Sequence, residues 1–223
     1  MPELKTQGLA IGRDRFLDVL RSRDLLVAKR KRRGPKTTYS KHEYAVAPNM
    51  IKSLEITRPA QVLVADITYV RINEMFAYLF LITDACSRFI VGHHLATSLS
   101  HKGAITALER AVANLGLTKG ILHHTDRGGQ YCCHDFISQI KKYEMISSMT
   151  DADHCAQNAL AERMNGTLKD EYYIDMTFHS FKQAKVAIDQ AVEVYNYERP
   201  HLALDMEKPA RVHFAAEHFK IVA

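Results

Sequence analysis

The fold is decided by the stretch Val62-Leu63-Val64-Ala65-Asp66-Ile67-Thr68-Tyr69-Val70. It is rich in β-branched residues and lacks a clean apolar–polar alternation, which is typical of a strand buried on both faces. Asp66 does not suit such a strand, because a buried carboxylate without a partner is strongly destabilising. We therefore expect it to have a hydrogen-bond donor, a cation or a metal ion beside it. The plainer alternatives are an ion pair with arginine or a position at the solvent-facing end of the strand.

The flanking sequence predicts the rest of the fold. Apolar runs at 78–82 and 89–91 follow closely, so the first three strands should be antiparallel neighbours. Downstream, helix and strand patterns alternate. The expected elements are a helix over 102–115, a short strand from Ile121 to Asp126, and helices over 134–142, 156–171 and 180–197. This order predicts an α/β fold with a mixed sheet. A ribonuclease-H-like arrangement fits it, as do other mixed sheets.

The composition is that of an ordinary globular domain. Of the 223 residues, 47% are hydrophobic and 25% charged, which argues against disorder. No apolar run approaches the roughly 18 residues of a membrane span, and the first residues do not form a signal peptide. The four cysteines show no CxxC spacing, so we expect reduced thiols in a cytoplasm, with no membrane partner.

Positive charge is concentrated at the N-terminus. Residues 1–50 contain 12 Lys or Arg against 5 Asp or Glu, and the rest of the chain contains 18 against 20. The densest run is Lys29, Arg30, Lys31, Arg32 and Arg33. A basic arm beside a near-neutral body indicates contact with a polyanion such as DNA, and a solvated linker is the alternative. We expect two regions: a partly helical DNA-binding segment with its basic linker over 1–50, whose helix spans 11–26, and a catalytic core over 55–218.

A second acidic residue ends the fourth predicted strand. Asp126 is followed by Arg127-Gly128-Gly129-Gln130-Tyr131, and two glycines let a backbone turn sharply or pass close to a ligand. An ordinary turn would have the same composition.

The third acidic residue lies on the helix predicted over 156–171. Leu160, Met164 and Leu168 form its apolar stripe, and a polar face carries Asn158, Glu162, Asn165 and Lys169. A solvated helix face is again the plainer interpretation. The set of three favours a function, since two aspartates at strand ends and a helical glutamate can converge at one side of a sheet.

Three carboxylates suit a magnesium site. Mg²⁺ prefers hard oxygen ligands and near-octahedral geometry. Two such ions, roughly 4 Å apart, can activate an attacking hydroxyl and stabilise the leaving 3′ oxygen of a phosphodiester. The sequence thus predicts that Asp66, Asp126 and Glu162 bind two Mg²⁺ ions, which Mn²⁺ can replace. Asp84, Asp151 and Asp153 are expected to lie outside this site.

These residues belong to an ordered set of motifs that resembles a known family. The chain resembles the insertion-sequence transposases made from two overlapping reading frames, which share a DDE catalytic core with retroviral integrases. The matching stretches are Asp66-Ile67-Thr68-Tyr69, Asp84 with Ser87 to Gly92, His123 to Tyr131, Asn158-Ala159 through Glu162 to Glu171, and Tyr195-Asn196 with Arg199-Pro200-His201. Asp126 and Glu162 are separated by 35 residues, as the family requires.

The resemblance implies a ribonuclease-H-like mixed five-stranded sheet flanked by helices, behind a short, basic helical segment. It also implies metal-dependent cleavage and strand transfer at the element's terminal inverted repeats, into target DNA. Lys169 would face DNA, and we add Asn165, Asn158, Arg127 and the basic run 29–33 as further candidates. We further expect the chain to form a homo-oligomer on DNA and to have the product of an upstream overlapping frame as a partner. Its expected location is the bacterial cytoplasm, at the nucleoid.

Two departures from the family pattern leave alternatives open. The N-terminal helical region is shortened, so the chain could be a truncated copy or the second frame alone. The zinc module of retroviral integrases is absent from the sequence, and His124 is expected to be structural rather than a metal ligand. Two other functions therefore stay open: a catalytically inactive DNA-binding remnant, or a ribonuclease-H-like nuclease that cuts DNA without joining it.

Overall fold

The computed structural model of the protein describes residues 8, 10–26, 42–151 and 158–215. They belong to two compact units, Met1–Gly34 and Pro35–Ala223. The first unit contains helix α2 (Arg13–Ser22), which is shorter than the predicted helix over 11–26. On its exposed side Arg21 forms an ion pair with Asp18. The basic run from Lys29 to Arg33 lies outside the described residues.

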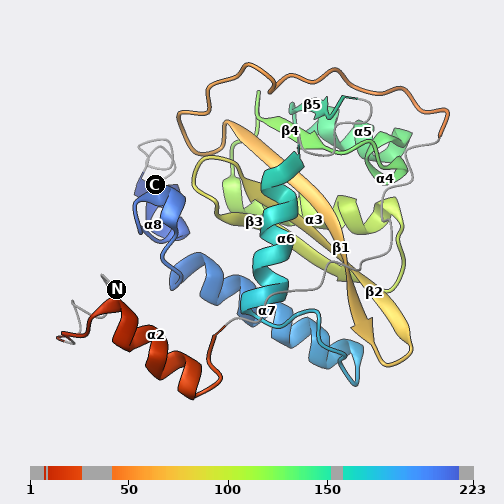
Figure 1. The fold of residues 1–223 in the computed structure, drawn as a ribbon. Helices are drawn as coiled ribbons and strands as arrows, with labels where there is room; N and C mark the ends of the chain where they lie inside the picture. Colours follow the sequence, from red (N-terminus) through yellow and green to blue (C-terminus); the bar gives the residue numbers. More distant parts are fainter. Residues whose placement is uncertain (1–7, 9, 27–41, 152–157, 216–223) are drawn as a thin grey trace. The chain divides into compact units, whose positions relative to one another are not determined.

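The second unit contains a mixed five-stranded sheet (Figure 1). Its strands are β1 (Val62–Ile72), β2 (Met75–Asp84), β3 (Ile90–Ala96), β4 (Leu122–Thr125) and β5 (Ile146–Met149). The spatial order is β3-β2-β1-β4-β5. The first three strands are antiparallel, as predicted, whereas β4 runs parallel to β1 and β5 parallel to β4.

Helices lie on both faces of this sheet. They are α3 (His101–Leu115), α4 (Gly129–Cys132), α5 (His134–Lys142), α6 (Ala159–Glu171), α7 (Phe181–Tyr197), the 3₁₀ turn η2 (Leu202–Leu204) and α8 (Pro209–Ala215). Serine side chains fix the starts of the two longest helices, because Ser100 accepts a hydrogen bond from the Lys102 amide and Ser180 accepts one from the Gln183 amide. None of the described helices is long and apolar enough to cross a membrane.

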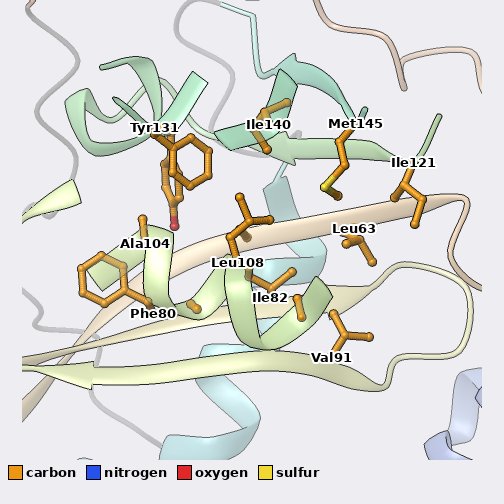
Figure 2. Close-up of a cluster of buried hydrophobic side chains, with 14 of the residues drawn as sticks. Leu63, Phe80, Ile82, Val91, Ala104, Leu108, Ile121, Tyr131, Ile140 and Met145 are labelled. Atoms are coloured by element: carbon orange, nitrogen blue, oxygen red, sulfur yellow. The ribbon is translucent and has the colours of Figure 1, made fainter. Parts of the chain in front are cut away.

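One face of the sheet packs against α3, α4 and α5. Figure 2 shows Leu63 and Phe80 of the sheet in the same apolar cluster as Ala104 and Leu108 of α3. The contact between β3 and α3 is close at Gly92, where any Cβ would overlap the backbone of α3. Glycine is therefore required there for the helix to approach the strand.

The opposite face packs against α6 and α7. Val70, Leu79 and Leu81 of the sheet form a second apolar cluster with Met164 and Leu168, which belong to the stripe predicted for α6. Since side chains alternate along a strand, Val62, Val64 and Asp66 all point to this face. The face of β1 that carries Asp66 is therefore the face covered by α6.

The fifth strand was not located from the sequence. The stretch Ile146-Ser147-Ser148-Met149 is short and half polar, so it lacks a clear strand pattern. Residues before β1 also join the sheet here: the Met149 amide donates to the Pro48 carbonyl at 3.4 Å, and the Met50 amide donates to Ser148 Oγ at 2.9 Å. Residues 48–50 therefore contact the core, and the domain boundary drawn from composition stays a prediction.

Candidate active site

Asp66 lies in the middle of β1 and faces α6. The Asn165 side-chain amide, from α6, donates a hydrogen bond to Asp66 Oδ2 at 2.7 Å. One strand position earlier, the Ala65 carbonyl accepts a hydrogen bond from the Asn158 side-chain amide at 3.1 Å. The start and the middle of α6 are thus both attached to β1 beside this carboxylate.

Asp126 follows β4 and is in register with Asp66. The parallel ladder pairs Val62 with Leu122 and Val64 with His124, so paired residues differ by 60, as Asp66 and Asp126 do. Adjacent strands lie about 4.8 Å apart, so continuing this register brings the two aspartates side by side. The Gly128 amide donates to Asp126 Oδ1 at 3.0 Å, and a Cβ on Gly128 would lie only 3.1 Å from the same oxygen. A small residue is therefore needed to fold the turn around Asp126.

Glu162 belongs to the face of α6 that is directed at β1. It lies between Asn158 and Asn165, which are both buried and both bonded to the strand. The Glu162 side chain itself is exposed. The polar helix face predicted from spacing therefore faces the sheet at Asn158 and Asn165 and reaches solvent at Glu162.

The other two carboxylates affect the pKa of Asp66. The pKa of Asp66 is raised to about 7, first by burial and next by the negative charge of Asp126, with a smaller contribution from Glu162. Hydrogen bonds from the Ile67 backbone and from Asn165 oppose the rise. Because an adjacent cation would favour the ionised form, this carboxylate is suited to bind one.

The donor set at this site consists of oxygen atoms. Besides the carboxylates, the side-chain oxygens of Asn158 and Asn165 are buried and accept no hydrogen bond from any residue in the described ranges. Hard oxygen donors of this kind match Mg²⁺. However, no three Asp, Glu, His or Cys side chains among the described residues are already arranged as ligands of one ion. The residue types fit magnesium, and the complete ligand geometry stays a prediction.

Known proteins with these features belong to one family. Models of the integrase core domain match residues 56–155 and 143–209. An insertion element IS600 protein of 31 kDa from Shigella sonnei is 35% identical over 210 residues, or 93% of this chain and 77% of the relative. The transposase InsF for insertion sequence IS3A from Escherichia coli K12 is 30% identical over 201 residues, which cover 89% of this chain and 69% of InsF. The chain belongs to the IS3-family transposases.

Solved structures confirm the ribonuclease-H-like fold of the transposase. The HTLV-2 integrase catalytic core domain, determined with magnesium in a trimeric form, superposes with a TM-score of 0.56 at 19% identity, covering 70% of this chain and 97% of that domain. A chain of the simian T-cell lymphotropic virus intasome with PP2A regulatory subunit B56γ gives a TM-score of 0.63 at 16% identity, covering 96% of this chain and 70% of that one.

The sequence did not reveal a role for Tyr131 of the transposase. Its ring is buried and packs against Phe136 in the apolar cluster that Figure 2 shows, and its hydroxyl has no hydrogen-bond partner within the described part of the chain. Burial raises the pKa of Tyr131 well above its usual range, and Asp66 and Asp126 raise it further. The phenol therefore stays protonated next to the two aspartates, where it is a donor. The only signal in the sequence was an aromatic residue five positions after Asp126.

The predicted DNA contacts lie in different environments. Asn158 and Asn165 direct their amide groups at β1, and Arg127 Nε donates to the Thr150 carbonyl at 2.7 Å. All three thus have a structural role within the protein. Lys169 lies in the last turn of α6 and is half-buried. DNA contact by these four residues, and by the run Lys29 to Arg33 outside the described residues, stays a prediction.

Other acidic residues of the transposase have local partners. Asp84 is fully buried, and it accepts hydrogen bonds from the Ala60, Cys86 and Ser87 amides and from Ser87 Oγ. Asp151 forms an ion pair with Lys52 at 3.6 Å, and Asp153 lies outside the described residues.

His124 and Arg199 both make contacts that join elements of the core, and for His124 a structural role was predicted. His124 is buried, and its Nδ1 lies 2.9 Å from Ser148 Oγ, so this contact links β4 to β5. Arg199 donates two hydrogen bonds to the Glu171 carboxylate, both at 2.6 Å. That pair joins the end of α7 to the end of α6, so Arg199 forms a salt bridge between two helix ends.

Proposed function

We propose that this IS3-family transposase is a metal-dependent polynucleotidyl transferase that cleaves DNA at the ends of its insertion element and joins those ends to target DNA. The observation that carries the proposal is the Asp66 carboxylate. The register of β1 with β4, continued by two residues, brings it beside Asp126; Asn165 holds it, and burial followed by its acidic neighbours raises its pKa. A carboxylate with a strongly raised pKa that lies close to other acidic residues is typical of a catalytic site.

Asp66, Asp126 and Glu162 would hold two Mg²⁺ ions, or Mn²⁺ in their place. When bound, such ions lower the pKa of an attacking water or 3′ hydroxyl and stabilise the leaving oxygen. The protein residues set the geometry for this step. Asn165 fixes the rotamer of Asp66, the Gly128 amide fixes that of Asp126, and the exposed Glu162 side chain has room to turn toward both.

The relatives support the choice of substrate. The transposase InsF acts in insertion sequence IS3, and an intasome is an assembly on DNA. We therefore take the substrates to be the terminal inverted repeats and target DNA, bound by an oligomer of this chain in a bacterial cytoplasm. The product of an upstream overlapping frame is the further partner that we propose.

Two substitutions on α6 test the proposal. Glu162 and Lys169 lie about 20° apart around the helix and roughly 10 Å apart along it, so the lysine can reach a phosphate beside the ions without binding them. With a labelled duplex carrying an element end, Glu162→Gln should abolish Mg²⁺-dependent cleavage and leave DNA binding within about twofold of wild type. Lys169→Ala should weaken binding and leave cleavage that recovers at high DNA concentration.

The same assay separates this function from the alternatives. Cleavage without any joined product in the presence of target plasmid would identify a nuclease. Binding without Mg²⁺-dependent nicking by the wild type would identify an inactive remnant. Cleavage that persists in excess chelator would refute the two-metal proposal directly.

A further inference from the structure

A cavity of about 470 Å³ lies beside α6, next to the site but lined by different side chains. Its wall combines a residue of the turn between β2 and β3 with the first half of α6 and with η2. The residues that matter for its chemistry are Arg88, Leu160, Arg163, Met164, His201 and Leu202. Cavities that bind small ligands in proteins are of this size, about 300–1,000 Å³.

Positive charge dominates the polar part of this cavity. Arg88 and Arg163 both line it, and no Asp or Glu is among its lining residues in the part of the chain that the structure describes. Burial lowers the pKa of Arg88; Tyr195, Cys86 and Asp84 oppose this, and the positive charge of Arg163 adds a smaller lowering effect, so the two guanidinium groups repel each other. Within the described ranges no carboxylate forms an ion pair with Arg163. An anion placed between these groups would relieve the repulsion.

His201 adds a neutral hydrogen-bond donor. Burial and the nearby arginines Arg199 and Arg88 lower the pKa of His201, so the ring is uncharged at neutral pH. Its Nδ1 accepts a hydrogen bond from the Ala203 amide at 3.3 Å, which leaves the proton on Nε2. The neighbouring Arg199 is neutralised by Glu171, so it does not compete for the same anion.

The rest of the cavity is apolar. Leu160 and Met164 form its floor along α6, and Leu202 from η2 stands at its rim with 83% of its surface exposed. Leu202 therefore adds exposed apolar surface next to the two arginines of the cavity. The combination suits a ligand with a flat apolar part and an attached anion.

We propose that this cavity binds one unpaired nucleotide of a DNA strand, with its phosphate between Arg88 and Arg163 and its base against Leu160, Met164 and Leu202. The proposal rests on the proposed function for the identity of the polymer. Arg163 directly follows Glu162 in α6, so the cavity adjoins the proposed catalytic residues along this helix. An unpaired nucleotide is required because the bases of a duplex are stacked and paired.

Binding measured in chelator tests the phosphate contact without any chemistry. The probe is a fluorescent single-stranded oligonucleotide, bound to the full-length chain over a series of salt concentrations. Arg163→Ala should weaken binding at least fivefold and reduce the slope of log K against log salt by about 0.7, the value for one phosphate contact on a single strand. The matched control is Arg211→Ala, since Arg211 is exposed on α8 and pairs only with Glu207 within the described structure. It should stay within twofold of wild type.

The base contact needs a second pair of variants. Leu202→Ser should weaken binding of the single strand about threefold or more and leave an abasic strand of equal length unaffected. The control is Leu117→Ser, because Leu117 is also exposed, at 67%, and does not line the cavity. Neither leucine is in the core, so both variants should keep the wild-type melting temperature.

The outcomes distinguish the two proposals. If Arg163→Ala and Arg211→Ala weaken binding equally, the nucleotide site is overturned, even if the wild type cleaves DNA. The same holds if Leu202→Ser weakens binding of normal and abasic strands equally. A change in self-association instead of DNA binding would assign the cavity to a protein contact and would also overturn it. Arg163-dependent binding by a wild type that fails to cleave would support the cavity and reject the proposed catalysis.

Discussion

Asp66 and Asp84 are both aspartates on central strands of the same sheet, yet they have opposite surroundings. Asp84, at the end of β2, is fully buried and accepts four hydrogen bonds, three of them from backbone amides. Asp66, in the middle of β1, accepts one side-chain hydrogen bond and faces two other acidic residues. The structure satisfies the charge of Asp84 and leaves that of Asp66 in need of a cation.

The difference separates a structural residue from a functional one. The donors around Asp84 belong to the chain before β1 and to the turn after β2, so this carboxylate joins two loops at one end of the sheet. Ser87 Oγ extends the connection to His213 of α8 at 3.0 Å. Asp66, by contrast, is buried beside Asp126 and Glu162, and these effects on its ionised form outweigh the hydrogen bonds from the Ile67 backbone and Asn165. Giving up stability in this way is typical of catalytic sites.

The largest expected effect is on folding. Asp84→Ala leaves four buried donors without their acceptor, and each such loss costs about 1–3 kcal/mol. We expect the free energy of unfolding to fall by about 5 kcal/mol, which lowers Tm by roughly 10–20 °C for a domain of this size. Thermal unfolding followed by circular dichroism measures it. A variant with unchanged Tm would show that the carboxylate does not hold the two loops.

The next effect is the pH dependence of stability without metal. The pKa of Asp66 is raised from 3.8 to about 7 in the folded protein, so the folded state binds the proton more tightly than the unfolded state. The contribution of Asp66 to stability is therefore greatest below pH 4, falls as pH rises toward 7, and is constant above it. Between pH 4 and pH 8 the free energy of unfolding should therefore fall, through Asp66, by at most about 4 kcal/mol, as measured by denaturant unfolding in chelator.

Two controls isolate the Asp66 contribution to that curve. Asp66→Asn should remove this part of the pH dependence, because asparagine does not ionise, and should be more stable than wild type at pH 8 in chelator. Adding Mg²⁺ should raise the stability of the wild type at pH 8 and leave that of the variant nearly unchanged. A wild type whose stability is insensitive to Mg²⁺ would contradict the proposed ligand role.

A smaller effect is expected from the amide that positions Asp66. Asn165→Ala removes a hydrogen bond that lowers the pKa of Asp66, so the acidic limb of the pH–rate profile should move to higher pH. Loss of a group that orients a metal ligand costs about 10–100-fold in activity. Asn158→Ala is the matched control, since its amide binds the Ala65 carbonyl instead. A shifted limb in both variants, or in neither, would rule out a specific role for Asn165.

The smallest effect should come from the ion pair between Arg199 and Glu171. It is bidentate, but both side chains reach solvent, with 23% and 36% of their surfaces exposed. Pairs of this kind contribute about 0.2–1 kcal/mol. Arg199→Ala should thus lower the free energy of unfolding by less than about 1 kcal/mol and leave DNA binding in chelator unchanged. A large loss of DNA binding would instead show that Arg199 contacts DNA.

The sequence by itself determined the strands β1 to β4, the main helices and the family. The elements depend on local patterns, such as the apolar run around Asp66 and the stripe from Leu160 to Leu168, and the family depends on the order and spacing of motifs, such as those of Asp126 and Glu162. The sequence also predicted that one polar face of α6 carries Asn158, Glu162 and Asn165. The local patterns are readable because each lies within a single strand or helix.

Only the tertiary structure decided which groups lie next to Asp66. The offset that aligns it with Asp126 depends on the parallel pairing of β1 with β4, and strand register is not a property of either strand alone. The strand β5, the buried Tyr131 hydroxyl and the four donors around Asp84 likewise depend on segments far apart in the sequence. Two aspartates of identical chemistry became a structural anchor and a candidate metal ligand because their neighbours across space, not along the chain, set the free energy of their charges.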